Sequence, residues 1–240
     1  LMSEEGYSPV CEDIINQSWH KMTPEELSKN LESDLNEGLT QETAQKKLKV
    51  TGTNCLYEDE SALYKILKHL FSRITVPLYI IAFLFYLAYR EGLINSFVYR
   101  TLPLIAFVIS VITIIKSENA AKEIKLVENQ IPQKCTVIRE KKEMTISRYE
   151  IVPGDIVKVK IGETVPADIR ILYANDCKIN IQCLTDTETI LDRSEKCTSQ
   201  EFLQSQNIAY FGSVCAQGEC KGVAISTGQK TLLSRLVHSK

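Results

Sequence analysis

The chain has 240 residues, which is enough for one large domain or two small ones. Its 28 Lys and Arg residues are balanced by 30 Asp and Glu residues, so the net charge of −2 excludes an overall basic field that would attract nucleic acid or anionic lipid. The eight cysteines include no C-x-x-C pair and none of the usual zinc spacings. The sequence therefore predicts reduced thiols, no metal site and no nucleic-acid partner.

The first part of the chain predicts a disordered tail followed by two short helices. Residues 1–17 are acidic and lack the apolar stretch of a secretory signal. Residues 23–26 (Thr-Pro-Glu-Glu) have the pattern of a capping box, and a second helix is expected between Thr40 and Gly52. Residues 18–60 are therefore predicted to be a helical segment that precedes any membrane region.

Two apolar stretches predict a helical hairpin that crosses a membrane. Residues 74–89 and 101–115 contain no charged residue, and apolar neighbours extend each toward the roughly 20 residues that span a bilayer. We predict spans at about 74–91 and 98–116 within a membrane segment of residues 61–128, antiparallel because their connection is short. A pair of buried helices in a soluble protein is the alternative, although two such stretches with tyrosines near their ends are unusual in a soluble core.

The residues that flank these stretches predict how the hairpin is placed. Lysines before and after it modestly favour cytoplasmic locations for both termini, in either the plasma membrane or the endoplasmic reticulum. The apolar stripe of residues 61–74 is typical of a helix that lies on the membrane surface. An ordinary amphipathic helix packed on a globular partner fits that stripe equally well. The lipid bilayer is the expected partner of the hairpin itself.

After the hairpin, a polar helix at residues 117–128 leads into a sequence with the period of strands. Short strands are expected at residues 135–139, 144–146, 155–161, 168–173 and 178–183, turns at 153–154 and 174–176, a hairpin of 207–214 with 221–227 around Gln217 and Gly218, and a helix at 231–237. The whole chain is therefore predicted to be an α+β membrane protein, with N-terminal helices, an antiparallel transmembrane helical hairpin and a small β-rich domain.

Several motifs occur in the order in which P-type ATPases carry them. The stretches are 20–23 (His-Lys-Met-Thr), 38–40, 52–54, 131–133, 137–139, 152–155 (Val-Pro-Gly-Asp), 162–163, 165–168 (Val-Pro-Ala-Asp), 169–172, 207–211 and 227–228. One Pro-Gly-Asp or Pro-Ala-Asp is weak evidence, because turns often use these residues. In this order behind an apolar hairpin, they make the chain resemble P-type cation-transporting ATPases, most closely the sodium/potassium and proton/potassium pumps, from about Ser18 onward.

The resemblance implies a division of the chain into domains and a mechanism. Residues 129–240 would form the actuator domain, a distorted jelly-roll, and residues 18–60 would join it. The motif residues Pro153, Gly154, Asp155, Pro166, Ala167 and Asp168 would have structural roles in that domain. In the family, an aspartate of a separate domain is phosphorylated by ATP with Mg²⁺, and a Thr-Gly-Glu-Ser loop of the actuator positions the water that removes the phosphate. Rotation of the actuator then pulls on the first two membrane helices.

The predicted catalytic loop departs from the family pattern. Aligned without gaps from Ala167 and Asp168, the family's Thr-Gly-Glu-Ser falls on Thr185, Asp186, Thr187 and Glu188. A threonine at 187 has no basic group that could accept a proton from water near neutral pH. Asp186 adds negative charge where the backbone should approach a phosphate. Glu188 could replace the missing base only if the loop shifted by one position, and Ile190 stands where a proline is usual.

Three readings follow for the chain as a whole. It contains no Asp-Lys-Thr-Gly phosphorylation motif and no glycine-rich phosphate loop, so by itself it is expected to be inactive and to bind neither ATP nor Mg²⁺. It is interpreted as the N-terminal part of a pump-like protein, whose remainder or another pump subunit would be its partner. A natural short pseudo-ATPase that regulates or binds a true pump is the alternative. An unrelated small membrane protein with a partner-binding β domain is the third reading.

Overall fold

The computed structural model describes residues 18–56, the single positions Tyr64, Leu67 and Phe71, and residues 75–92, 96–185 and 187–238. The chain divides into two compact units, which we call the sheet unit (Leu1–Leu56 with Val127–Lys240) and the helical unit (Tyr57–Leu126). The predicted tail at 1–17 lies outside the described residues, as does nearly all of the predicted surface helix at 61–74.

The two predicted N-terminal helices are confirmed, with the ends that the sequence indicates. Helix α2 (Pro24–Asn30) begins with a complete capping box, in which the Thr23 hydroxyl accepts from the Glu26 N–H and the Glu26 carboxylate accepts from the Thr23 N–H. Helix α3 (Gln41–Thr51) is capped by Thr40 at its start and ends at Gly52, whose φ of 78° suits glycine. Both termini are therefore set by local side-chain chemistry.

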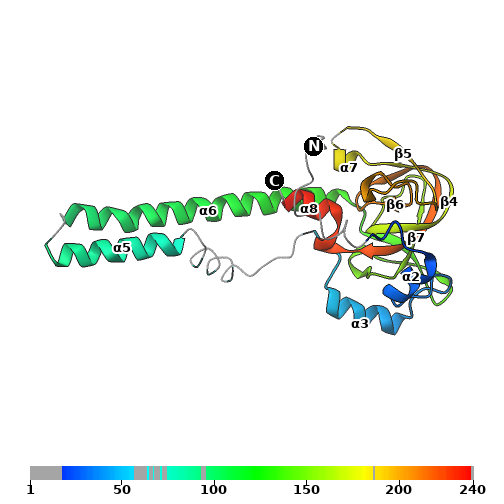
Figure 1. Cartoon of the computed structure of the whole chain (residues 1–240), viewed down its shortest axis with the longest axis horizontal. Helices are drawn as coiled ribbons and strands as arrows, with labels where there is room; N and C mark the ends of the chain where they lie inside the picture. The colour runs from blue at the N-terminus through cyan, green and yellow to red at the C-terminus, as the bar shows by residue number, and fades with distance from the viewer. Residues whose placement is uncertain are drawn as a thin grey trace. The chain divides into compact units, whose positions relative to one another are not determined.

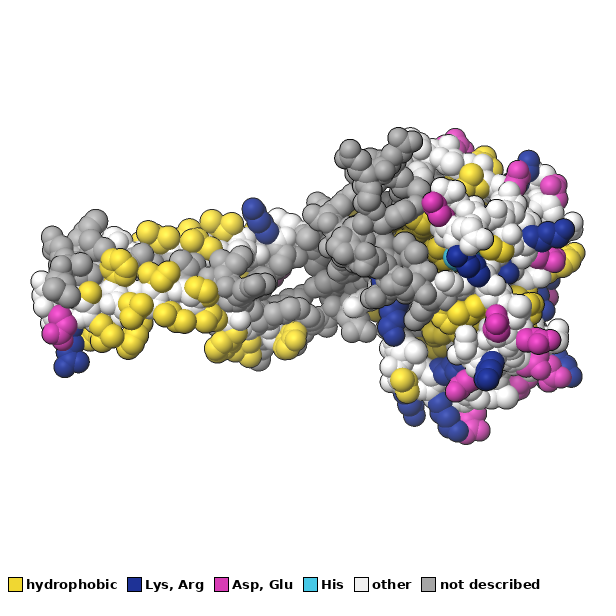
Figure 2. All heavy atoms as spheres, viewed as in Figure 1, with side chains coloured by type: hydrophobic (Ala, Val, Ile, Leu, Met, Phe, Trp, Pro, Cys, Tyr) yellow, Lys and Arg dark blue, Asp and Glu magenta, His cyan; other side chains and the backbone are white. Residues whose placement is uncertain are grey.

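The helical unit contains the two apolar stretches. Helix α5 (Thr75–Arg90) is followed by a turn at Glu91 and Gly92, and helix α6 (Ser96–Gln130) continues through the predicted polar segment into the sheet unit. Figure 2 shows hydrophobic side chains, in yellow, over the visible face of these helices. Among the described residues, however, no helix combines the length and hydropathy that a membrane crossing requires.

The sheet unit is built on one antiparallel sheet, as the β-rich prediction requires (Figure 1). Its strands are β1 (Lys134–Arg139), β2 (Lys142–Ser147), β3 (Ile156–Lys160), β4 (Asp168–Asn180), β5 (Ile190–Arg193), β6 (Ile208–Ala209) and β7 (Val214–Ser226). The order is β2-β1-β3-β7-β4-β5, and β6 pairs with β4. Short helical elements connect them: η2 (Arg148–Glu150), α7 (Gln182–Thr185), η3 (Phe202–Gln204), η4 (Gly228–Lys230) and α8 (Leu232–His238).

Three sequence predictions within the sheet are wrong. The expected turn at 174–176 lies inside the continuous strand β4, and Gln182 and Cys183 belong to α7 rather than to a strand. The expected hairpin around Gln217 and Gly218 is likewise one continuous strand, β7.

The wrong turn and the wrong hairpin have one shared cause, a paired irregularity between the two long strands. The β4–β7 register shifts between Asn175 and Lys178, and Asp176 has a φ of 47° there. Opposite it, Gly218 has a φ of 70°, and a Cβ atom at this position would lie 2.2 Å from the Asn175 carbonyl oxygen. Residues that usually make turns therefore form a β-bulge, which bends the strands without ending them.

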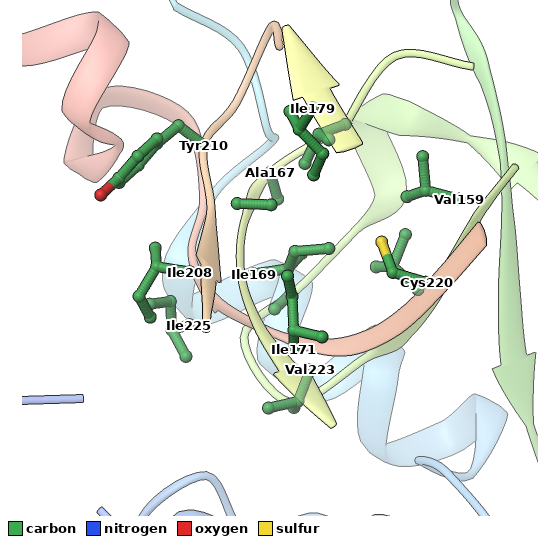
Figure 3. Close-up of a cluster of buried hydrophobic side chains, with 14 of the residues drawn as sticks. Val159, Ala167, Ile169, Ile171, Ile179, Ile208, Tyr210, Cys220, Val223 and Ile225 are labelled. Atoms are coloured by element: carbon green, nitrogen blue, oxygen red, sulfur yellow. The ribbon is translucent and has the colours of Figure 1, made fainter. Parts of the chain in front are cut away.

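The core of the sheet unit lies against the inward faces of β3, β4 and β7. Figure 3 shows Ile169 and Ile171 of β4 beside Val223 of β7, and Ile225 of β7 beside Ile208 of β6; all five side chains are buried. The N-terminal segment packs on the same core through Leu27 of α2 and through Leu31, the residue that follows the last turn of α2. The sheet unit therefore needs residues from both ends of the sequence to bury its apolar surface.

Candidate functional site

The predicted catalytic loop connects α7 to β5 and is closed by backbone hydrogen bonds. The Ile181 N–H donates to the Thr189 carbonyl at 2.9 Å, which holds the two ends of the loop together. The Asn180 side chain accepts from the Gln182 N–H at 3.0 Å and starts α7. Of the four predicted residues, Thr185, Thr187 and Glu188 are described and Asp186 is not.

The threonines of this loop bond to the loop itself. The Thr185 hydroxyl donates to the Thr187 carbonyl at 2.9 Å, and the Thr187 hydroxyl lies 3.3 Å from that of Thr189. Both Thr187 and Glu188 are exposed. Among the described residues between Thr185 and Thr189, the loop presents to solvent the hydroxyl group of Thr187 and the carboxylate of Glu188. Such a set can hydrogen-bond a ligand but offers no base at the position where the family pattern requires one.

The Pro-Ala-Asp motif lies in the interior of the sheet unit. Asp168 is fully buried, and its two carboxylate oxygens accept from the Phe211 and Leu232 N–H groups, each at 2.8 Å. Burial raises the pKa of Asp168 to about 6, against the lowering effect of these two donors. Asp168 thus ties the segment before β7 and the start of α8 to the first residue of β4. Pro166 and Ala167 are also buried.

The Pro-Gly-Asp motif joins the sheet to the N-terminal segment. Asp155 forms a bidentate ion pair with Arg139, at 2.8 and 2.7 Å, and both side chains are buried. The Gly154 carbonyl accepts from the Ser33 hydroxyl at 2.6 Å, and Gly154 has a φ of 99°. Pro153 precedes this turn, and its carbonyl accepts from Lys47 at 3.4 Å. The structure therefore places both motifs in connections of the sheet unit, where all of their residues are buried except Pro153, which is half-buried.

The sequence assigned no individual role to three buried polar residues of the sheet unit, Asn54, Arg139 and Arg148, although the first two lie in the motif stretches 52–54 and 137–139. Period-two alternation puts Arg139 on the inward face of β1 beside Val137, and this signal could have identified it. Arg148 is paired with Glu128, 20 residues earlier, and Asn54 bonds to Gly228, 174 residues later. No local pattern reveals pairings over such separations.

The described residues also show what the chain offers to a metal ion. In that part of the chain, no group of three or more His, Cys, Asp and Glu side chains is placed to hold a metal ion. Cys177, Cys215 and Cys220 are buried together, and their environment raises the pKa of Cys177 to about 12. All three thiols belong to the buried core, where they act as packing groups.

Comparison with known proteins matches the two parts of the chain to two families. Residues 129–239 match the P-type ATPase actuator domain, and residues 19–85 match the cation transporter/ATPase N-terminus. Sodium/potassium-transporting ATPase subunit alpha-3 of Gallus gallus is 34% identical over 227 residues, which are 90% of this chain and 22% of that protein. The alpha-3 and alpha-2 subunits of Homo sapiens are 32% and 33% identical over the same shares.

The chain therefore spans about a fifth of the length of the curated relatives it matches, 22% in each case. The matched regions follow one another in the order that the motifs predict, and the actuator match coincides with the strands and the buried aspartates described above. This chain belongs to the P-type cation-transporting ATPases, of which it carries the N-terminal domain and the actuator domain.

Proposed function

We propose that this chain is the lever of a P-type cation transporter, in which the sheet unit couples phosphorylation and dephosphorylation of a separate domain to helices that gate the ion path. The proposal is supported by the actuator match and by the continuity of α6, whose 35 residues leave the helical unit and end within the sheet unit. A helix without a break transmits a rotation along its length better than a flexible linker does.

The helices of the lever would lie in a bilayer as an antiparallel hairpin, with both termini in the cytoplasm. Large apolar side chains are exposed along both helices: Tyr79, Ile80, Ile81, Phe83, Leu84, Tyr86, Leu87 and Tyr89 on α5, and Leu104, Ile105, Phe107, Val108, Ile112 and Ile115 on α6. Such a surface is unfavourable in water and favourable in lipid. Helix α5 has 16 residues, about 24 Å at 1.5 Å per residue, so residues beyond its ends would complete the crossing.

The lever would not promote hydrolysis of an aspartyl phosphate. The observation that carries this part of the proposal is Thr187, a hydroxyl bonded within its own loop at the position of the family's glutamate. Removing a general base lowers the rate of such a step by about 10²–10⁴-fold. ATP and Mg²⁺ would bind to other domains of the transporter and not to this region.

A chimera tests this function directly. When residues 18–238 replace the matching region of a sodium/potassium pump, we expect a phosphorylated enzyme that forms from ATP and then persists, with a dephosphorylation rate reduced by about 10²–10⁴-fold. The measurement is the decay of acid-stable ³²P after a chase with unlabelled ATP, and the unmodified pump is the control. Decay at the rate of the unmodified pump would contradict the proposal and would identify Glu188 as a working substitute.

The same loop supports a second candidate function. A fold that keeps its buried ion pairs while losing the catalytic glutamate is also suited to a regulator or binding partner of a complete pump. One immunoblot of alkaline-extracted membranes, with an antibody to residues 135–240, addresses both candidates. Retention of the band in the pellet is expected for the bilayer hairpin, and release into the supernatant would contradict it. A band several-fold larger than 27.2 kDa supports the transporter, whereas a band at 27.2 kDa supports the regulator.

A further inference from the structure

Both chain connections between the two units are fastened at one place in the sheet unit. The chain leaves the sheet unit after Leu56 and re-enters it at Val127. Asn54 lies just before the first connection and Glu128 just after the second. Both residues bond to the short helix η2 (Arg148–Glu150), which joins β2 to the Pro-Gly-Asp turn.

The second connection is held by the side chain of Arg148, which is fully buried. Its Nη2 donates to the Glu128 carboxylate at 3.1 Å, to the Glu128 carbonyl at 3.3 Å and to the Tyr149 hydroxyl at 2.9 Å. The guanidinium also lies over the Tyr149 ring, 4.5 Å from its centroid, and 5.9 Å from that of Phe211. Glu128 is in the last turn of α6, where unpaired carbonyls attract a cation, so Arg148 binds both the charge and the helix end.

The first connection is held by Asn54, which is also fully buried. Its N–H donates to the Tyr149 carbonyl at 3.1 Å, and its side-chain amide donates to the Arg148 carbonyl at 3.0 Å and to the Pro166 carbonyl at 2.7 Å. Its side-chain oxygen accepts from the Gly228 N–H at 2.7 Å. Two consecutive residues, Arg148 and Tyr149, thus bind both connections: their backbone carbonyls bind Asn54 before the first connection, and the Arg148 side chain binds Glu128 after the second.

We infer that η2 is the coupling joint of the lever, with Arg148 as the positioning residue that makes α6 and the sheet unit turn together. A buried, charge-assisted contact with several directional hydrogen bonds resists rotation, because any turn of the helix end would leave Glu128 unpaired in a low dielectric. The mechanical role assigned to the joint rests on the lever function proposed above. The clamp itself is a property of the sheet unit and can be tested separately.

Hydrogen exchange on the full chain in detergent micelles tests the clamp. In Arg148→Met, we expect the amides of residues 127–131 to exchange about tenfold faster or more, because the last turn of α6 loses its cap, while amides of β4 at Ile169 and Ile171 keep their protection. Arg148→Lys should restore part of the protection, since a lysine keeps the charge but not the flat, branched donor. The readout is exchange measured by mass spectrometry on peptides from each region.

Arg193→Met is the matched control. Arg193 is 5% exposed, donates to the Ser205 carbonyl at 2.9 Å and lies 5.4 Å from the Tyr210 ring, but it has no contact with α6 among those described. This variant should leave residues 127–131 as protected as in the natural sequence. If exchange at residues 127–131 became equally faster in both variants, Arg148 would stabilise the sheet unit only in general, and the inference would be overturned.

Two further measurements keep the clamp and the lever distinguishable. If Arg148→Met does not fold, Glu128→Gln replaces it, and exchange at residues 127–131 should still rise several-fold because the amide lacks the negative charge. Unchanged protection of residues 127–131 in Glu128→Gln would refute the clamp at η2, whether or not the chain acts as a lever. In the pump chimera, Arg148→Met should also slow the conformational step that follows phosphorylation. Faster local exchange without any change in that step would confirm the clamp and refute its mechanical role, while the lever function itself is tested by the decay of the phosphorylated chimera.

Discussion

Replacing Asp186, Thr187 and Glu188 by Gly, Glu and Ser in the pump chimera is expected to accelerate dephosphorylation by about 10²–10⁴-fold. The glutamate restores a group that can accept a proton from the attacking water. The glycine removes a negative charge and a Cβ atom from the place where the backbone meets the phosphate. Formation of the phosphorylated enzyme should not change, because the loop has no role in the attack on ATP. The measurement is the decay of acid-stable ³²P during a chase.

Partial replacements separate the three changes. Asp186→Gly with Glu188→Ser, without the change at Thr187, should stay slow, because the base is still missing. Glu188→Gln in the otherwise natural loop should leave the slow rate unchanged, since the exposed Glu188 is not expected to reach the water. A triple variant that still keeps its phosphate would place the defect outside the loop and would refute the assignment of the loss to Thr187.

Arg139→Met is expected to lower the free energy of unfolding of the sheet unit by about 3–5 kcal/mol, the usual effect of removing one partner from a buried ion pair. Asp155 would keep only the Val152 N–H, at 3.0 Å, among the donors described here, while remaining inside the protein. The Glu150 carbonyl and the Gln41 side chain would also lose a donor. Unfolding by urea can be followed in the full chain, because Trp19 is its one tryptophan and packs against the core of this unit.

An exposed pair in the same sheet is the control for this prediction. Lys158 and Glu143 lie 2.8 Å apart, with side chains that are 26% and 51% exposed. Lys158→Met should leave the free energy of unfolding almost unchanged, because water screens the pair and solvates the remaining partner. Comparable losses in the two variants would contradict the view that burial of Asp155, rather than the ion pair as such, determines the effect.

The parts of the fold that depend on neighbouring residues could be predicted from the sequence. Thr23, Glu26, Thr40 and Gly52 determine the helix ends over three or four positions, and both helices were predicted correctly. The alternation of Ile156 to Lys160 likewise identified β3. The turn predicted at Asp176 and the hairpin predicted at Gly218 were wrong for one shared reason. Each residue adopts its positive φ because the other strand lies opposite, and that pairing is not visible in either segment alone.

The candidate site divides in the same way. The departure at Thr187 could be read from the sequence, since it needs only an alignment over a short distance from Asp168. The hydrogen bonds that close the loop, and the burial of Asp168 under Phe211 and Leu232, depend on where β7 and α8 pack. Long-range contacts of this kind are set by tertiary structure, and single-sequence patterns carry no information about them.

The discontinuous sheet unit also determines the order in which the newly made chain can fold. The His20 carbonyl accepts a hydrogen bond from the Asn207 side chain, 187 residues later. The Asn54 side chain accepts one from the Gly228 N–H, 174 residues later. At about 5–20 residues per second, a ribosome needs about 10–40 s to cover the distance from His20 to Asn207. During that interval, Leu27 and Leu31 have no core to enter, although α2 can already form. We therefore expect the apolar side chains of the N-terminal segment to stay exposed until β7 is complete, and a chain whose synthesis stops before Gly228 to be cleaved by proteases more readily than the full chain.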